Sequence, residues 1–75
     1  MADSITDFLE RDPVAALLFE GYCLIVQVHR AQGQPWSGVK AIVEGENPAF
    51  KTDAYFQRLF PYALHYIQQL EEEEK

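Results

Sequence analysis

The sequence of 75 residues has little of what small proteins use to reinforce a core, since Cys23 is its only cysteine. One thiol cannot form a disulfide within a chain, and a lone cysteine is typical of a reducing compartment, so we expect a cytoplasmic protein. Cys23, His29 and His65 are the only soft metal ligands, too few for a structural zinc site. A short chain with neither a bridge nor a metal must depend on close packing or on a second molecule.

Basic residues are also scarce. Six Lys and Arg stand against twelve Asp and Glu, which gives a net charge of −6. Because phosphate binding needs clustered Lys and Arg, direct binding to nucleic acid or to an anionic membrane is disfavoured. No run of 18 or more apolar residues occurs, and the acidic start MADSITDFLERD lacks the pattern of a signal peptide, so we expect no membrane span.

Motifs of catalysis are missing as well. Gly-rich phosphate loops, G-x-S-x-G, H-E-x-x-H and Cys-x-x-Cys do not occur. Cys23 and His29 are spaced so that a helix would not bring them together, and His65 with Glu72 lacks a third member. We therefore predict a protein that is not an enzyme and has no catalytic residue, no cofactor and no metal.

Apolar and aromatic residues, in contrast, are abundant, at 48% and 13% of the chain. The longest apolar stretch follows Asp12 and Pro13, a favoured N-cap and first helical residue, and stops at Gly33 and Pro35. This helix is apolar on most sides, so we expect it to be largely buried. The segment CLIVQVH would also suit a strand, but the length and the Asp-Pro start favour the helix.

The predicted fold class is all-α: a compact bundle of three to four helices in a single domain of residues 1–75, with a long apolar central helix. Residues 1–11 are predicted to form an N-terminal arm or a short helix. Residues 71–75 are predicted to form an acidic tail that frays, because carboxylates do not suit the negative end of a helix dipole.

Residues 39–45 leave two alternatives open. Ser37 could cap a short helix that Gly45 ends, or the segment VKAIVEG could be a strand paired with CLIVQVH. We favour the helix, because a lone strand has no other partner in the chain.

The last helix is predicted to start near Thr52, with Asp53 in its first turn. Apolar residues spaced by three or four mark its core face, where Phe56 and Phe60 belong. Pro61 falls inside this pattern. An interior proline removes a hydrogen bond and clashes with the preceding turn, at about 3 kcal/mol, unless the helix bends. We therefore predict a C-terminal helix bent at Pro61, or two helices that meet near Arg58.

The surplus of aromatic surface suggests binding to other molecules. Tyrosine packs its ring against a neighbour and keeps its hydroxyl in water, which is why interfaces are enriched in it. Glycine within a helix often marks the close approach of another helix, so we also expect a homodimer. The predicted partner-binding residues are Trp36, Tyr55, Tyr62, Tyr66, Glu71 and Glu72, and the predicted dimer or helix-crossing residues are Gly21, Tyr22 and Ile25.

The sequence thus favours a small acidic, non-catalytic protein-binding module, an inhibitor, anti-activator or adaptor of the kind found in phages and mobile elements. A first alternative is a nucleic-acid mimic, in which Glu71–Glu74 and other carboxylates occupy the basic groove of a nuclease or an RNA-guided effector, as an anti-CRISPR protein would. A second alternative is a small ligand-binding protein or enzyme with an aromatic pocket and His65 or Tyr66 at its mouth.

Overall fold

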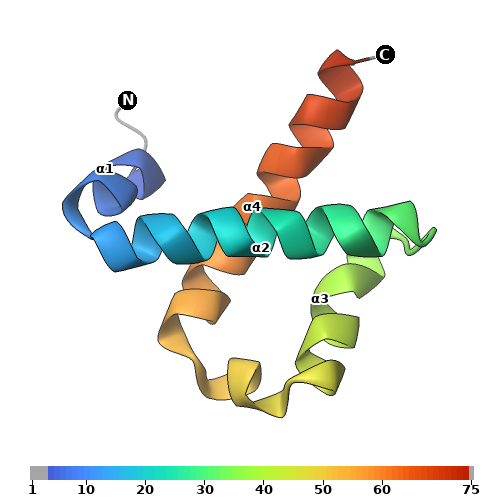
Figure 1. Ribbon diagram of the computed structural model, residues 1–75, viewed down its shortest axis with the longest axis horizontal. Helices are drawn as coiled ribbons and strands as arrows, with labels where there is room; N and C mark the ends of the chain where they lie inside the picture. Colours follow the sequence, from blue (N-terminus) through green and yellow to red (C-terminus); the bar gives the residue numbers. More distant parts are fainter. Residues whose placement is uncertain (1–3, 75) are drawn as a thin grey trace.

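The computed structural model describes residues 4–74, which form helices joined by short connections. The elements are α1 (Ser4–Arg11), α2 (Pro13–Ala31), α3 (Trp36–Glu46), the 3₁₀ helix η1 (Pro48–Thr52) and α4 (Ala54–Glu73). Helix α2 crosses α4, and α3 and η1 close a loop on one side of α2, while α1 and the C-terminal half of α4 project on the other (Figure 1). The molecule is flat, at 34 × 34 × 18 Å. No strand occurs in these residues, so the all-α bundle is confirmed, as is the helical interpretation of residues 39–45.

Helix α2 begins and ends where its local sequence predicts. The Asp12 carboxylate accepts hydrogen bonds from the backbone N–H groups of Val14 (3.0 Å) and Ala15 (3.3 Å). These bonds satisfy donors that have no partner within the first turn. At the other end, Gly33 adopts φ 89°, a left-handed conformation that stops the helix and that glycine takes up without strain.

The ends predicted for α3 are wrong. The helix begins one residue before Ser37, because Pro35 is already extended and its carbonyl accepts the N–H of Gly38 at 3.0 Å. No side chain caps this end. Gly45 does not stop the helix, because its φ is not positive, and α3 continues to Glu46.

Helices α2 and α4 supply most of the core, together with one side of α3. Phe56 stacks on Phe50 at 4.4 Å and on Phe60 at 4.5 Å, and the Tyr22 ring meets Phe56 edge-on at 5.4 Å. The expected core position of Phe56 and Phe60 is confirmed. The buried apolar residues are Ala15, Tyr22, Val26, Val39, Val43, Phe56, Leu59, Phe60, Ala63 and Ile67.

Helix α2 is less buried than its sequence predicts. Only Ala15, Tyr22 and Val26 are buried, because α4 covers one side and no other described element covers the opposite side. By length and composition α2 is also the one helix within residues 4–74 that could cross a membrane, although a helix from a protein core meets the same criterion. The outer side of α2 therefore leaves Val14, Leu17, Leu24 and Val28 exposed.

Pro61 lies inside α4, so the alternative of two helices meeting near Arg58 is wrong. The Asp53 carboxylate caps α4 by accepting from the N–H groups of Tyr55 (2.9 Å) and Phe56 (3.2 Å). The helix then continues through Glu73, into the acidic run predicted to fray. The bend at Pro61 stays a prediction.

Candidate functional site

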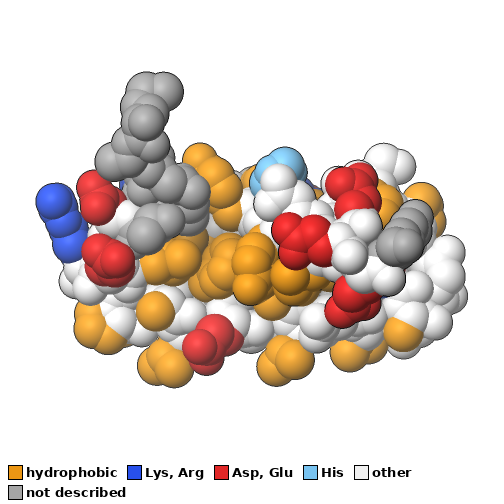
Figure 2. Space-filling model, turned by 90° about the horizontal axis from the view of Figure 1, so that it is seen from above, with side chains coloured by type: hydrophobic (Ala, Val, Ile, Leu, Met, Phe, Trp, Pro, Cys, Tyr) orange, Lys and Arg blue, Asp and Glu red, His pale blue; other side chains and the backbone are white. Residues whose placement is uncertain are grey.

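Two of the predicted partner-binding tyrosines lie on the outer side of α4. Tyr62 is 42% exposed and Tyr66 is 47% exposed. Residues four apart share one face of a helix, so the two rings form one surface. The Tyr66 ring centre lies 5.9 Å from that of Phe19 on α2. Hydrophobic side chains gather between α1 and the C-terminal half of α4 (Figure 2).

An open groove of about 430 Å³ separates α4 from α2 at this place. We call it the tyrosine groove. It is lined by Phe19, Glu20, Cys23, Leu24 and Tyr66. Its wall is apolar, with one carboxylate, which suits an aliphatic or aromatic side chain of another molecule.

The thiol in the tyrosine groove is poorly suited to nucleophilic chemistry. Burial raises the pKa of the Cys23 thiol above its usual value, and the nearby Glu20 carboxylate raises this pKa further. The thiolate, not the thiol, is the nucleophile, so Cys23 is protonated and weakly reactive at neutral pH. The groove offers apolar contact rather than a reactive group.

Tyr55, also predicted to bind a partner, makes contacts within the chain. Its hydroxyl donates to the Asp12 carboxylate at 2.7 Å, and its ring stacks on Phe8 with centres 6.2 Å apart. The Arg58 guanidinium lies 4.3 Å from the centre of the Phe8 ring. These contacts hold α1 and the start of α2 against α4, so Tyr55 joins helices.

The Tyr55–Asp12 bond is expected to make stability sensitive to acid. The Tyr55 hydroxyl is the main cause that lowers the pKa of Asp12 from its ordinary value of 3.8. Burial opposes this shift and is the next largest effect, and the N–H groups of Ala15 and Val14 lower the pKa further. Because the folded pKa lies below the unfolded one, this stabilisation is present above 3.8 and is lost as the pH falls through the folded pKa. Tyr55→Phe should therefore melt at a lower temperature than the unmodified protein at neutral pH. Its melting temperature should also fall by less than that of the unmodified protein when the pH is lowered. Thermal melts followed by circular dichroism from roughly pH 6 to pH 2 measure this.

Tyr62→Phe is the control, since Tyr62 is exposed and its loss of a hydroxyl should leave the acid profile unchanged. If Tyr55→Phe loses as much stability in acid as the unmodified protein, the bond does not set the pKa of Asp12.

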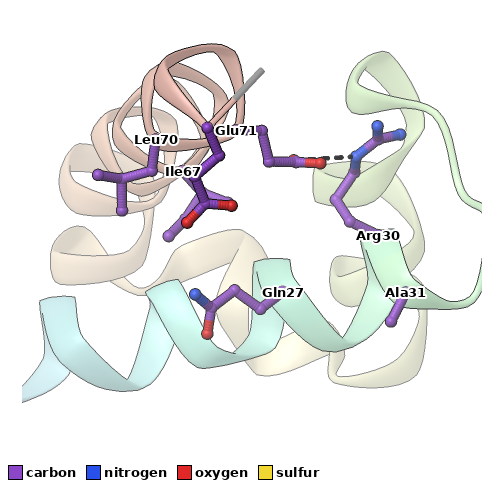
Figure 3. Close-up of a pocket in the computed structure, with 7 residues that line it drawn as sticks. Gln27, Arg30, Ala31, Ile67, Leu70 and Glu71 are labelled. Carbon is purple, nitrogen blue, oxygen red and sulfur yellow. Dashed lines mark ion pairs between the residues drawn. The ribbon is translucent and has the colours of Figure 1, made fainter.

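The other predicted residues lie near the opposite end of α2. Arg30 from α2 and Glu71 from α4 point toward one another, with Nε and Oε2 3.6 Å apart (Figure 3). Arg30 Nη1 donates to the Gln34 carbonyl at 2.7 Å, and its guanidinium lies 4.2 Å from the centre of the Trp36 ring. An open groove of about 390 Å³ is lined there by Gln27, Arg30, Ala31, Ile67, Leu70, Glu71 and Glu74.

Two of the predicted partner-binding residues, Trp36 and Glu71, are therefore in contact with Arg30 of the same chain. Trp36 and Glu71 are half-buried, whereas Glu72 is exposed. Sequence reasoning singled out Trp36 and Glu71 and missed Arg30, whose only signal was its place near the C-terminal end of α2. Consecutive glutamates also point in directions about 100° apart around a helix, so Glu71–Glu74 do not form a straight row of charge.

The predicted dimer or helix-crossing residues face different ways. Tyr22 is buried against α4, and Ile25 is half-buried. A Cβ atom added at Gly21 would meet no other atom within 4 Å, so no described helix of this chain crosses there. The sequence analysis did not identify a stripe of exposed apolar residues on the outer side of α2, although these residues and Gly21 are spaced by three and four in the sequence. The large exposed residues of this stripe are Val14, Leu17, Leu24 and Val28.

Within residues 4–74, no three His, Cys, Asp or Glu side chains gather into a possible metal site. No known protein family matches the chain, and no curated protein or solved structure resembles it significantly. The interpretation of the tyrosine groove therefore rests on its geometry and chemistry.

Proposed function

We propose that this chain is a non-catalytic protein-binding module that holds a partner protein at the tyrosine groove. The observation that supports this most strongly is that Tyr62 and Tyr66 are both exposed on α4, and that Tyr66 also lines an apolar groove. Tyrosine is among the residues that contribute most binding energy at interfaces, because it buries a large ring and keeps its hydroxyl hydrated. The protonated Cys23 thiol is consistent with binding rather than covalent chemistry.

The finer proposal is that binding inhibits or recruits the partner in the cytoplasm, as small acidic proteins of phages and mobile elements do. A net charge of −6 favours a partner whose contact surface is neutral or basic. Glu72, Glu73 and Glu74 are exposed at the end of α4 and are available to basic groups at the rim of the interface.

The double variant Tyr62→Ala/Tyr66→Ala tests the proposal. The tagged protein is used to capture partners from lysates of candidate bacterial hosts, with quantitative mass spectrometry as the readout. We expect a protein enriched on the unmodified chain to fall by at least about tenfold on the variant, because both anchors are lost. The matched control is Gln68→Ala/Gln69→Ala, two exposed changes on the same helix that should keep the partner. Circular dichroism checks that helicity is retained. An unchanged set of captured proteins on the tyrosine variant would contradict the proposal.

A nucleic-acid mimic is the second candidate, because the exposed carboxylates at the end of α4 could enter a basic groove. Association driven by charge weakens steeply as salt screens it. A captured complex that survives washing at about 1 M salt is held by apolar contact, whereas one released between about 0.1 M and 1 M is held by charge. Retention on Tyr62→Ala/Tyr66→Ala together with salt release would favour the mimic.

A further inference from the structure

An uncovered apolar stripe runs along α2 on the side away from α4. Val14, Leu17, Leu24 and Val28 are 53%, 69%, 63% and 55% exposed. Several hydrophobic side chains, with an acidic side chain among them, project along the lower edge of Figure 2, the side of α2 that faces the viewer in Figure 1. We call this stripe the α2 seam. Its members, separated alternately by three and four residues, are Val14, Leu17, Gly21, Leu24, Val28 and Ala31.

This spacing is that of the contact line between two paired helices. Apolar residues that repeat every 3.5 residues on average keep one narrow line of a helix facing a second helix. The buried residues of α2, Ala15, Tyr22 and Val26, lie on the opposite side, so the α2 seam adds nothing to the core of the single chain.

Gly21 forms a notch in the middle of the α2 seam. A Cβ atom there would meet no other atom within 4 Å, so the fold of the chain does not require glycine. Glycine also weakens a helix relative to alanine. The notch is therefore open to a molecule that packs on the α2 seam.

We propose that the α2 seam binds the α2 seam of a second copy of this chain, with the two α2 helices antiparallel. In this register Leu24 lies over the partner's Gly21, and Leu17 lies over the partner's Val28. A large residue then fills the notch of the other chain at both sides of the twofold axis. A parallel pair would instead place two notches face to face and leave a void.

Charge also fits this arrangement. No member of the α2 seam is charged, so two copies of an acidic protein can approach along it. On one flank, antiparallel pairing places Glu20 beside the partner's Gln27, whose amide can donate to the carboxylate. On the other flank it places Leu18 beside the partner's Ile25, and both residues are half-buried in the single chain.

The size of the α2 seam sets the strength to expect. The 19 residues of α2 extend about 28 Å, most of the 34 Å width of the flat molecule, so the whole length is accessible to a second copy. A helix is only about 10 Å across, which places the contact below the roughly 800 Å² per partner of a standard stable interface. We therefore expect exchange between monomer and dimer at micromolar concentrations.

A lipid surface is the other cover that an apolar helix face allows. The net charge of −6 opposes binding to anionic bilayers. The α2 seam also repeats every 3.5 residues on average, which is the spacing of a helix that faces a second helix. These two observations favour the second copy of the chain.

Sedimentation velocity over a concentration series tests the proposal on the full chain. Leu17→Glu/Val28→Glu places carboxylates opposite one another across the α2 seam, and we expect the dimer dissociation constant to rise by at least about a hundredfold. Neither residue lines the tyrosine groove, although Leu24 of the α2 seam and the flanking Glu20 do, so self-association is measured here on the chain alone, without a captured partner. A chain that stays monomeric at about 1 mM would overturn the proposal.

Gly21→Leu separates specific pairing from general stickiness. Filling the notch should raise the melting temperature of the monomer, because leucine is the better helix former, and weaken the dimer by at least about tenfold. Gly45→Ala is the control, since it changes an exposed helical glycine away from the α2 seam. If Gly21→Leu strengthens association, or makes the chain sediment with phosphatidylcholine vesicles, the α2 seam is not a specific dimer interface.

Disulfide trapping tests the register, in a Cys23→Ala background. In the antiparallel pair, Leu17→Cys lies about 16 Å along the axis from the same residue of the partner, and so does Val28→Cys, beyond the roughly 7 Å that a disulfide allows between Cα atoms. We expect each variant alone to stay uncrosslinked and a mixture of the two to form a disulfide dimer. Crosslinking of either variant alone would show a parallel pair and overturn the antiparallel arrangement.

Discussion

Phe56→Ala is expected to remove most of the stability of this protein. The Phe56 side chain is fully buried and stacks on Phe50 at 4.4 Å and on Phe60 at 4.5 Å. Tyr22 meets the same ring edge-on at 5.4 Å. Truncation of a buried phenylalanine lowers the free energy of unfolding by about 3 to 5 kcal/mol, through lost burial and the cavity that remains.

That loss is large relative to the stability of so short a chain. A domain of this size has a free energy of unfolding of about 4 to 11 kcal/mol. Urea unfolding followed by circular dichroism should therefore show Phe56→Ala unfolded, or close to its midpoint, without denaturant. Tyr62→Ala is the matched control, an aromatic residue on the exposed side of the same helix, and should cost less than about 1 kcal/mol. Equal losses in the two variants would show that Phe56 is not at the centre of the core.

Features that depend on neighbouring residues were predictable from the sequence. The start of α2 follows from Asp12 and Pro13, and its end follows from Gly33, because capping uses only residues within one turn. The core position of Phe56 and Phe60 follows from helical spacing. The ends of α3 failed because Ser37 and Gly45 are compatible with a cap and with a helix interior alike.

Contacts between distant segments were not predictable in this way. Periodicity shows which residues of a helix share a face, but not which element covers that face. The pairing of Tyr55 with Asp12 and that of Arg30 with Glu71 depend on how α2 crosses α4, which no local pattern encodes. For the same reason the prediction that Tyr55 and Trp36 bind a partner did not foresee their burial. Both residues are half-buried and make contacts within the chain.

The exposed side of α2 also could not be predicted from the local sequence. The helix is apolar on most sides, which predicts burial, yet only the side with Tyr22 and Val26 is covered by α4. A chain of 75 residues has one other long helix, and that helix crosses α2 instead of running along it. The heptad spacing of the α2 seam is present in the sequence. It indicates a helix-pairing surface only once the structure shows that no other part of the described chain covers this face of α2.

Tyr22→Phe is expected to raise the free energy of unfolding by about 1 to 3 kcal/mol. The Tyr22 side chain is buried, and its hydroxyl has no hydrogen-bond partner within residues 4–74. A buried hydroxyl without a partner has lost its bonds to water and gained none, so its removal relieves that penalty. The ring contacts with Phe50, Phe56 and Phe60 are kept. Tyr22→Leu is the control, because it also removes the hydroxyl but loses the aromatic contacts, and it should be destabilising.

The pH dependence supplies a second readout for the same group. Burial raises the pKa of Tyr22 above its ordinary value of 10.0, and the Asp53 carboxylate adds to this rise. Because the folded pKa lies above the unfolded one, ionisation favours unfolding as the pH rises past the unfolded value. Tyr22→Phe should therefore lose less stability than the unmodified protein on the alkaline side of pH 10. If the variant is less stable than the unmodified protein at neutral pH, the Tyr22 hydroxyl has a hydrogen-bond partner, such as an enclosed water molecule. Equal sensitivity of the two proteins to alkali would instead show that the ionisation of Tyr22 is not linked to folding.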